Sequence, residues 1–76
     1  MTRQEFIGQL ETAFDAPAGS LREDGRLADQ KGWDSLSALA VIALIDEHYG
    51  VTVPAARLAD CETVGDIVRL AEGGPR

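Results

Sequence analysis

The segment from residue 35 to residue 49 constrains the fold most strongly, because it predicts a helix with apolar side chains on two opposite sides. Asp34 or Ser35 can cap its start, and Gly50 can end it in the left-handed conformation. At about 100° per residue, one side shows the i, i+3, i+4 spacing of a core-facing helix. This core side comprises Ala38, Val41, Ile42, Ile45 and Tyr49.

A second apolar side of the same helix lies almost opposite the core side. It comprises Leu36, Leu39, Ala40 and Ala43. A chain of 76 residues buries only about 60% of the surface that its unfolded form exposes, so a small bundle cannot bury both sides. Exposed apolar residues that gather on one face usually mark an interaction site. We therefore expect this side to face a partner; the alternative is that the preceding connection covers it.

Three further segments have helical patterns. The first, from about Arg3 to Asp15, begins with the capping-box sequence Thr2–Glu5 and fades before Pro17, which disfavours a helical residue ahead of it. A short helix is expected over residues 55–61, and a last helix is expected to begin at Thr63. No segment has the pattern of a strand. The predicted fold is all-α: a small four-helix bundle of three main helices and one short helix.

The predicted connection between the first two main helices, residues 17–33, is unusually long for so small a domain. Such connections tend to be functional. Leu21 and Leu27 are expected to fold it back onto the bundle, and Trp33 at its end is expected to be half-buried. The pair Glu23–Asp24 is expected to be solvated.

Charge and composition restrict the classes of function. Thirteen acidic and seven basic residues give a net charge of −6, which disfavours nucleic acid and suits basic patches on protein partners. With one cysteine, Cys61, and one histidine, His48, we expect neither an intrachain disulfide nor a metal site. We expect no signal peptide, because the first residues lead into a mixed polar segment, and no apolar run is long enough for a membrane. The expectation is one cytoplasmic domain over residues 1–76, ordered over about 2–72, with a tail at 73–76.

A short motif, Gly32-Trp33-Asp34-Ser35-Leu36, marks the start of the central helix. Asp-Ser alone is a common helix start, and three residues are not specific. The context is more informative: a capped helix, a long loop, this motif, a helix of about four turns, Gly-Val-x-Val-Pro, a short helix and Thr-Val-Gly-Asp-Ile-Val. From about Arg3 to Ala71, the order and spacing of these features resemble those of acyl carrier proteins.

The resemblance implies that Ser35 carries a 4′-phosphopantetheine arm, which a phosphopantetheinyl transferase moves from coenzyme A to the serine hydroxyl. Asp34 would orient the serine and offer a carboxylate to the transferase or its magnesium ion. Acyl groups would travel as thioesters between acyl-loading and acyl-processing enzymes of fatty-acid, polyketide or other specialised pathways. The protein would be a monomeric carrier and not an enzyme. The residues that dock partners would be Leu36, Leu39, Ala40, Ala43, Asp46 and Glu47.

The central helix departs from the pattern of fatty-acid synthase carriers, in which it is rich in acids. Ser37 and Ala40 stand where acids are common in that family, and only Asp46 and Glu47 remain before His48. A carrier dedicated to a specialised pathway fits better than a housekeeping fatty-acid carrier. The length of 76 residues favours a free-standing carrier over an excised module.

Two other classes of function are alternatives to a carrier. An unmodified helical adaptor would bind one partner through Leu36, Leu39 and Ala43. A hydrolase would need Ser35 and His48 in hydrogen-bond contact. They are 13 positions apart on one helix, which separates them by about 20 Å, so we reject the hydrolase.

Overall fold

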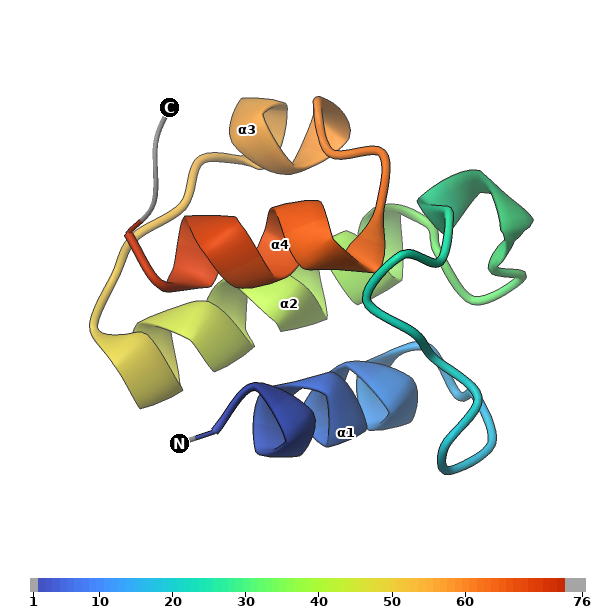
Figure 1. Ribbon diagram of the computed structural model, residues 1–76. Helices are drawn as coiled ribbons and strands as arrows, with labels where there is room; N and C mark the ends of the chain where they lie inside the picture. Colours follow the sequence, from blue (N-terminus) through green and yellow to red (C-terminus); the bar gives the residue numbers. More distant parts are fainter. Residues whose placement is uncertain (1, 74–76) are drawn as a thin grey trace.

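The computed structural model describes residues 2–73 of the chain, and within this range the fold contains four α-helices. In chain order the elements are α1 (Arg3–Ala13), the 3₁₀ helix η1 (Leu27–Asp29), α2 (Ser35–Tyr49), α3 (Ala55–Ala59) and α4 (Val64–Ala71). Helix α1 contacts both α2 and α4, and the short α3 contacts α2 (Figure 1). The predicted all-α bundle of three main helices and one short helix is confirmed.

An isolated bridge pairs Arg26 with Thr63, and residues 2–73 contain no named strand. No helix in that range is both long and apolar enough to cross a membrane. Of the tail predicted at 73–76, residues 74–76 lie outside the described residues.

Helix α2 has the bounds that its sequence predicts. Asp34 is its N-cap, and Gly50 ends it with a φ of 67°, a left-handed conformation that glycine adopts without strain. Helix α4 begins at Val64 with Thr63 as its cap, as predicted, whereas two other helices end earlier than predicted. Helix α1 ends at Ala13 rather than at Asp15, and α3 ends at Ala59 rather than at Cys61.

The early end of α1 is a Schellman turn. The N–H of Ala16 donates to the Glu11 carbonyl at 2.8 Å, and the N–H of Asp15 donates to the Thr12 carbonyl at 3.1 Å. Asp15 adopts a φ of 57°, a conformation that glycine usually supplies at this position and that aspartate tolerates better than most residues. This turn satisfies the last carbonyls of α1 and directs the chain away before Pro17.

The long connection folds back onto the bundle, as Leu21 and Leu27 predicted. Both side chains are buried in the core. A polar contact that the sequence did not predict reinforces this packing, because the buried carboxylate of Glu11 accepts a hydrogen bond from the Leu21 N–H at 3.1 Å. One bond therefore ties the connection to the last turn of α1.

Glu23 and Asp24 are both exposed, as expected for a solvated pair, and Glu23 also makes an ion pair that the sequence did not predict. The Glu23 carboxylate pairs with the Arg3 guanidinium at 2.7 Å, and the same guanidinium donates to both carboxylate oxygens of Glu72 at 2.8 and 2.9 Å. Arg3 thus joins α1, the connection and the end of α4. The hydrogen bond from Arg3 lowers the pKa of Glu72. All three groups are exposed, so each pair adds little to stability.

The two sides of α2 have opposite environments. On the core side, Val41 and Ile45 are fully buried and mark the centre of the predicted stripe. The other three predicted core residues, Ala38, Ile42 and Tyr49, are partly buried against the core. Ser37 is also buried, which the spacing of apolar residues along the helix did not predict. On the opposite side Leu36 and Leu39 are 78% and 62% exposed, so the connection does not cover this side.

The core collects side chains from every helix and from the connection. Its buried apolar members are Phe6, Leu10, Phe14, Leu21, Leu27, Val41, Ile45, Val53, Leu58, Val64, Ile67, Val68 and Ala71. Two aromatic pairs fix α2 against α1. Tyr49 meets Phe6 edge-on at 5.2 Å between ring centroids, and the half-buried Trp33 meets Phe14 at 5.3 Å. The predicted packing role of Trp33 is confirmed.

We predict that Ile45→Ala lowers the free energy of unfolding by about 2–5 kcal/mol, because it opens a cavity in the buried face of α2. Leu39→Ala on the opposite side is the matched control and should change stability by less than about 0.5 kcal/mol. Denaturant unfolding of the two variants and the wild type measures both values. Equal stabilities would mean that the core side is wrongly assigned.

Candidate functional site

A capping box builds the first turn of α2. The Asp34 Oδ1 accepts hydrogen bonds from the Ser37 N–H at 2.9 Å and from the Ser37 hydroxyl at 3.2 Å, while the Asp34 N–H donates to Ser37 Oγ at 2.8 Å. The bond from the Ser37 N–H is the main reason that the pKa of Asp34 lies below its ordinary value. The spacing of Asp34 and Ser37, three residues apart, is the sequence signal that could have revealed this box.

This arrangement gives Asp34 a capping role besides the role expected of it at Ser35, which stays a prediction. The resemblance implied that its carboxylate orients Ser35, but the carboxylate oxygen Oδ1 is held by Ser37. Asp34 is exposed as a residue, and it directly precedes Ser35. Asp34 therefore fixes the start of the helix and keeps a negative charge next to the serine.

The three serines of the chain differ in the freedom of their hydroxyls. Ser37 is buried and bonded to Asp34. Ser20 is exposed, but its hydroxyl donates to the Pro17 carbonyl at 2.6 Å. Ser35 is exposed at the first position of α2, and its hydroxyl makes no hydrogen bond within residues 2–73. It is thus the serine most open to chemical modification.

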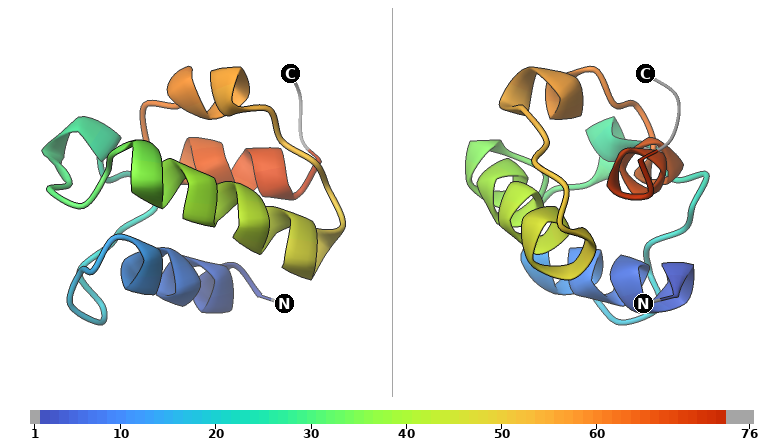
Figure 2. Two further views of the ribbon diagram at one scale, coloured as in Figure 1. Left: turned by 180° about the vertical axis from the view of Figure 1, so that it is seen from behind. Right: turned by 90° about the vertical axis from the view of Figure 1, so that its left-hand side faces the viewer.

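The residues expected to dock partners all lie exposed on α2. They are Leu36, Leu39, Ala40, Ala43, Asp46 and Glu47. In the left-hand view of Figure 2, α2 lies nearest the viewer and no other helix covers it. The four apolar residues follow Ser35 directly, whereas the two acids lie in the last turn of α2. The apolar part of this face therefore adjoins the free serine.

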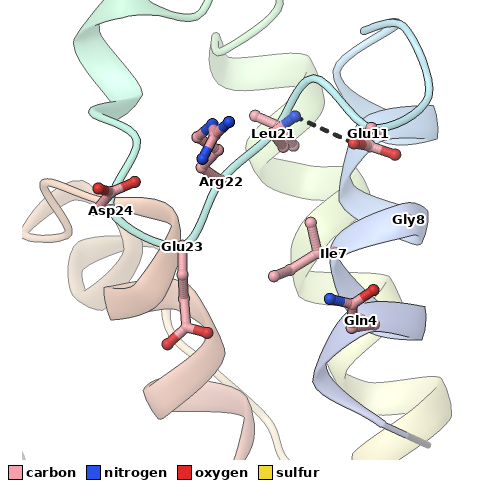
Figure 3. Close-up of a pocket in the computed structure, with 9 residues that line it drawn as sticks. Gln4, Ile7, Gly8, Glu11, Leu21, Arg22, Glu23 and Asp24 are labelled. Carbon is pink, nitrogen blue, oxygen red and sulfur yellow. Dashed lines mark hydrogen bonds between the residues drawn. The ribbon is translucent and has the colours of Figure 1, made fainter.

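Several grooves border the connection. A groove of about 600 Å³ separates α1 from the connection, with Gln4 and Ile7 on one side and Arg22 and Glu23 on the other (Figure 3). It contains none of the expected site residues. A smaller groove of about 330 Å³ runs beside the start of α2. Its lining residues are Ala13, Phe14, Asp15, Gly32, Asp34, Leu36, Ser37 and Ala40.

The single thiol of the chain is poorly suited to carry a cargo. Burial raises the pKa of Cys61 to about 11, so the thiol stays protonated near neutral pH. Its Sγ lies 3.6 Å from the Arg57 carbonyl. Among residues 2–73 no group of three or more His, Cys, Asp or Glu side chains is placed to hold a metal ion.

Comparisons with known proteins agree with this geometry. Residues 4–71 match the protein-family model described as "Phosphopantetheine attachment site". The acyl carrier protein MbtL of Mycolicibacterium paratuberculosis is 33% identical over 72 residues, which cover 95% of this chain and 81% of MbtL. The acyl carrier protein of Tropheryma whipplei is 33% identical over 67 residues, covering 84% of this chain and 79% of that protein.

A much larger protein also contains a similar segment. Orsellinic acid synthase of Beauveria bassiana is 46% identical over 55 residues, which cover 72% of this chain but 2% of the synthase. No solved structure gave a significant match to the chain.

We predict that the Asp34 cap makes stability depend on pH in the acid range. Because the folded-state pKa of Asp34 is lowered, its contribution is complete above the ordinary value of 3.8 and is lost as the pH falls through the folded-state value. Asn caps a helix as well as Asp but does not titrate. When the pH is lowered from 6 to below the folded-state pKa of Asp34, the melting temperature of Asp34→Asn should therefore fall less than that of the wild type.

Thermal melts at a series of pH values make this comparison. Asp24→Asn, in the exposed connection, is the control and should behave like the wild type. Equal acid sensitivity in Asp34→Asn and the wild type would contradict a role of the Asp34 charge in capping.

Proposed function

Because the chain belongs to the phosphopantetheine-binding acyl carrier proteins, we propose that the Ser35 hydroxyl is the attachment point of its arm. The protein carries acyl intermediates, and its cofactor is covalently attached 4′-phosphopantetheine. The arm supplies a terminal thiol that holds acyl groups as thioesters. The unmodified adaptor is not favoured. We propose a cytoplasmic, monomeric carrier without catalytic activity of its own, in line with its carrier relatives.

The observation that supports Ser35 is its free and exposed hydroxyl at the start of a 15-residue helix. In the proposed attachment, the serine oxygen forms a bond to the pantetheine-bearing phosphorus of coenzyme A. The bond from this phosphorus to adenosine 3′,5′-bisphosphate breaks, and the serine proton is released. Ser20 and Ser37 would first have to give up hydrogen bonds that hold their hydroxyls.

The residues around Ser35 suit a phosphodiester in two ways. The start of α2 carries the positive end of the helix dipole and its free amides, which favour a negative group on Ser35. Asp34 acts in the opposite sense, because its carboxylate is ionised near neutral pH. We propose that Asp34 instead meets the transferase or its magnesium ion.

The exposed side of α2 supports the proposal for partner docking. Leu36 and Leu39 offer apolar surface within the first two turns after Ser35, and Ala40 and Ala43 extend it. Transferase and acyl-handling enzymes would bury this surface while they reach the arm. Asp46 and Glu47 would contribute charge at the far end.

The sparse acids of α2 also support a specialised pathway. Fatty-acid synthase carriers resemble this chain in fold but have a more acidic central helix, as noted for Ser37 and Ala40. The similarity to a segment of orsellinic acid synthase is consistent with a polyketide-type role. We therefore propose a carrier whose partners recognise an apolar patch more than a charged one.

We predict that the wild type, incubated with coenzyme A, magnesium and a phosphopantetheinyl transferase, gains the mass of one phosphopantetheine. Ser35→Ala should gain nothing, because the acceptor oxygen is missing, while its circular dichroism stays that of the wild type since Asp34 still caps α2. Ser20→Ala is the matched control and should be modified normally. Intact-protein mass spectrometry reads the result, and a modified Ser35→Ala variant would refute the assignment.

We also predict that Leu39→Ala raises the KM of the transferase for the carrier about tenfold, corresponding to about 1.4 kcal/mol of lost docking energy. Raising the salt from low to physiological concentration should change the wild-type KM less than about twofold, because apolar burial is not screened. Steady-state kinetics at several salt concentrations measure both effects. A steep salt dependence together with a neutral Leu39→Ala would show that charges guide docking instead.

A further inference from the structure

The backbone of Gly32 lies directly against the end of α1. A Cβ atom placed on Gly32 would come within 1.8 Å of the Phe14 carbonyl oxygen and 2.7 Å of its carbonyl carbon. These are backbone atoms, so no side-chain rotation can relieve the clash. Gly32 is not among the described glycines with positive φ, which are Gly19, Gly50 and Gly73. Position 32 therefore requires glycine because of space and not because of backbone conformation.

The next residue makes a second contact with the same part of α1. The Trp33 ring packs on the ring of Phe14 at a tilt of 51°, and Phe14 is buried. Two successive residues, Gly32 and Trp33, thus both pack against Phe14. We call this set the Phe14 contact. Asp34 and Ser35 follow immediately, so the contact fixes the chain one residue before the cap of α2.

The position of Phe14 is itself determined by how α1 ends. Phe14 is the C-cap of α1, and the left-handed turn at Asp15 directs the chain away before Pro17. The end of α1 and the start of α2 lie at the same side of the bundle in both opposed views (Figures 1 and 2). The end of one helix therefore serves as a fixed support for the start of the next.

We propose that Gly32 is a positioning residue for attachment of the arm, acting through the Phe14 contact on Ser35. A side chain at position 32 would push the backbone of residues 32–34 away from Phe14 and displace Ser35 relative to Leu39, which lies one turn further along α2. The transferase would then dock on an intact apolar face but find the hydroxyl misplaced. This inference rests on the proposed role of Ser35.

The test compares Gly32→Ala with Gly8→Ala. Gly8 is a matched control, because it lies within α1 and a Cβ there meets nothing within 4 Å. With the carrier as the varied substrate of a phosphopantetheinyl transferase, Gly32→Ala should lower kcat at least tenfold and leave KM within twofold of the wild type. Gly8→Ala should leave both constants within twofold.

The split between kcat and KM separates positioning from mere destabilisation. If Gly32→Ala only unfolded part of the population, the concentration of competent carrier would fall, which raises the apparent KM and leaves kcat at saturation unchanged. That result, or unchanged constants, would overturn the proposal. Should Gly32→Ala fail to fold by circular dichroism, Trp33→Ala removes the other half of the Phe14 contact and should lower kcat, and Trp33→Phe should restore most of it.

An independent readout uses the unmodified chain. Gly32→Ala should shift the amide resonances of Asp34 and Ser37, the two residues of the α2 capping box, whereas Gly8→Ala should leave them in place. If the wild type never gains an arm, the role of Ser35 fails, yet the amide shifts still test the Phe14 contact. Unmoved amides in a folded Gly32→Ala variant would overturn the positioning inference.

Discussion

Burial of one side of α2 is the constraint on which the rest of the structure depends. The helix is apolar on two sides, and the bundle buries only the side that bears Val41 and Ile45. Aromatic pairs secure both ends, with Tyr49 on Phe6 at one and Trp33 on Phe14 at the other. Once this side is buried, the opposite side must face outward, so the candidate docking surface follows from the packing of the core.

The capping boxes stabilise the helix starts, and the box of α2 also determines which serine hydroxyl stays free. Helices α1, α2 and α4 each begin with a capping box, which matters in a domain too small to rely on its core alone. In α2 the box occupies the Ser37 hydroxyl and one oxygen of Asp34, and leaves the Ser35 hydroxyl exposed between them. The local folding of the helix start therefore supports Ser35 over Ser37 as the proposed attachment site.

The sequence predicted features that depend on neighbours along one helix. The bounds of α2 follow from Asp34 and Gly50, and its two sides follow from periodicity. Contacts between distant segments carried no such signal. The bond from Leu21 to Glu11 and the approach of Gly32 to Phe14 arise only when the connection closes on α1. The pairing of Arg3 with Glu72 arises only when the end of α4 reaches the start of α1. The capping role of Ser37 lies between these cases, since its spacing from Asp34 was visible but its burial was not.

The central claim is that one particular serine bears the arm. The most direct test is fragmentation of the tryptic peptide Gly32–Arg57 from the holo protein, because this peptide contains both Ser35 and Ser37. The structure predicts fragment ions that place the phosphopantetheine on Ser35. Fragments that place it on Ser37, or on a peptide outside residues 32–57, would contradict the proposed site.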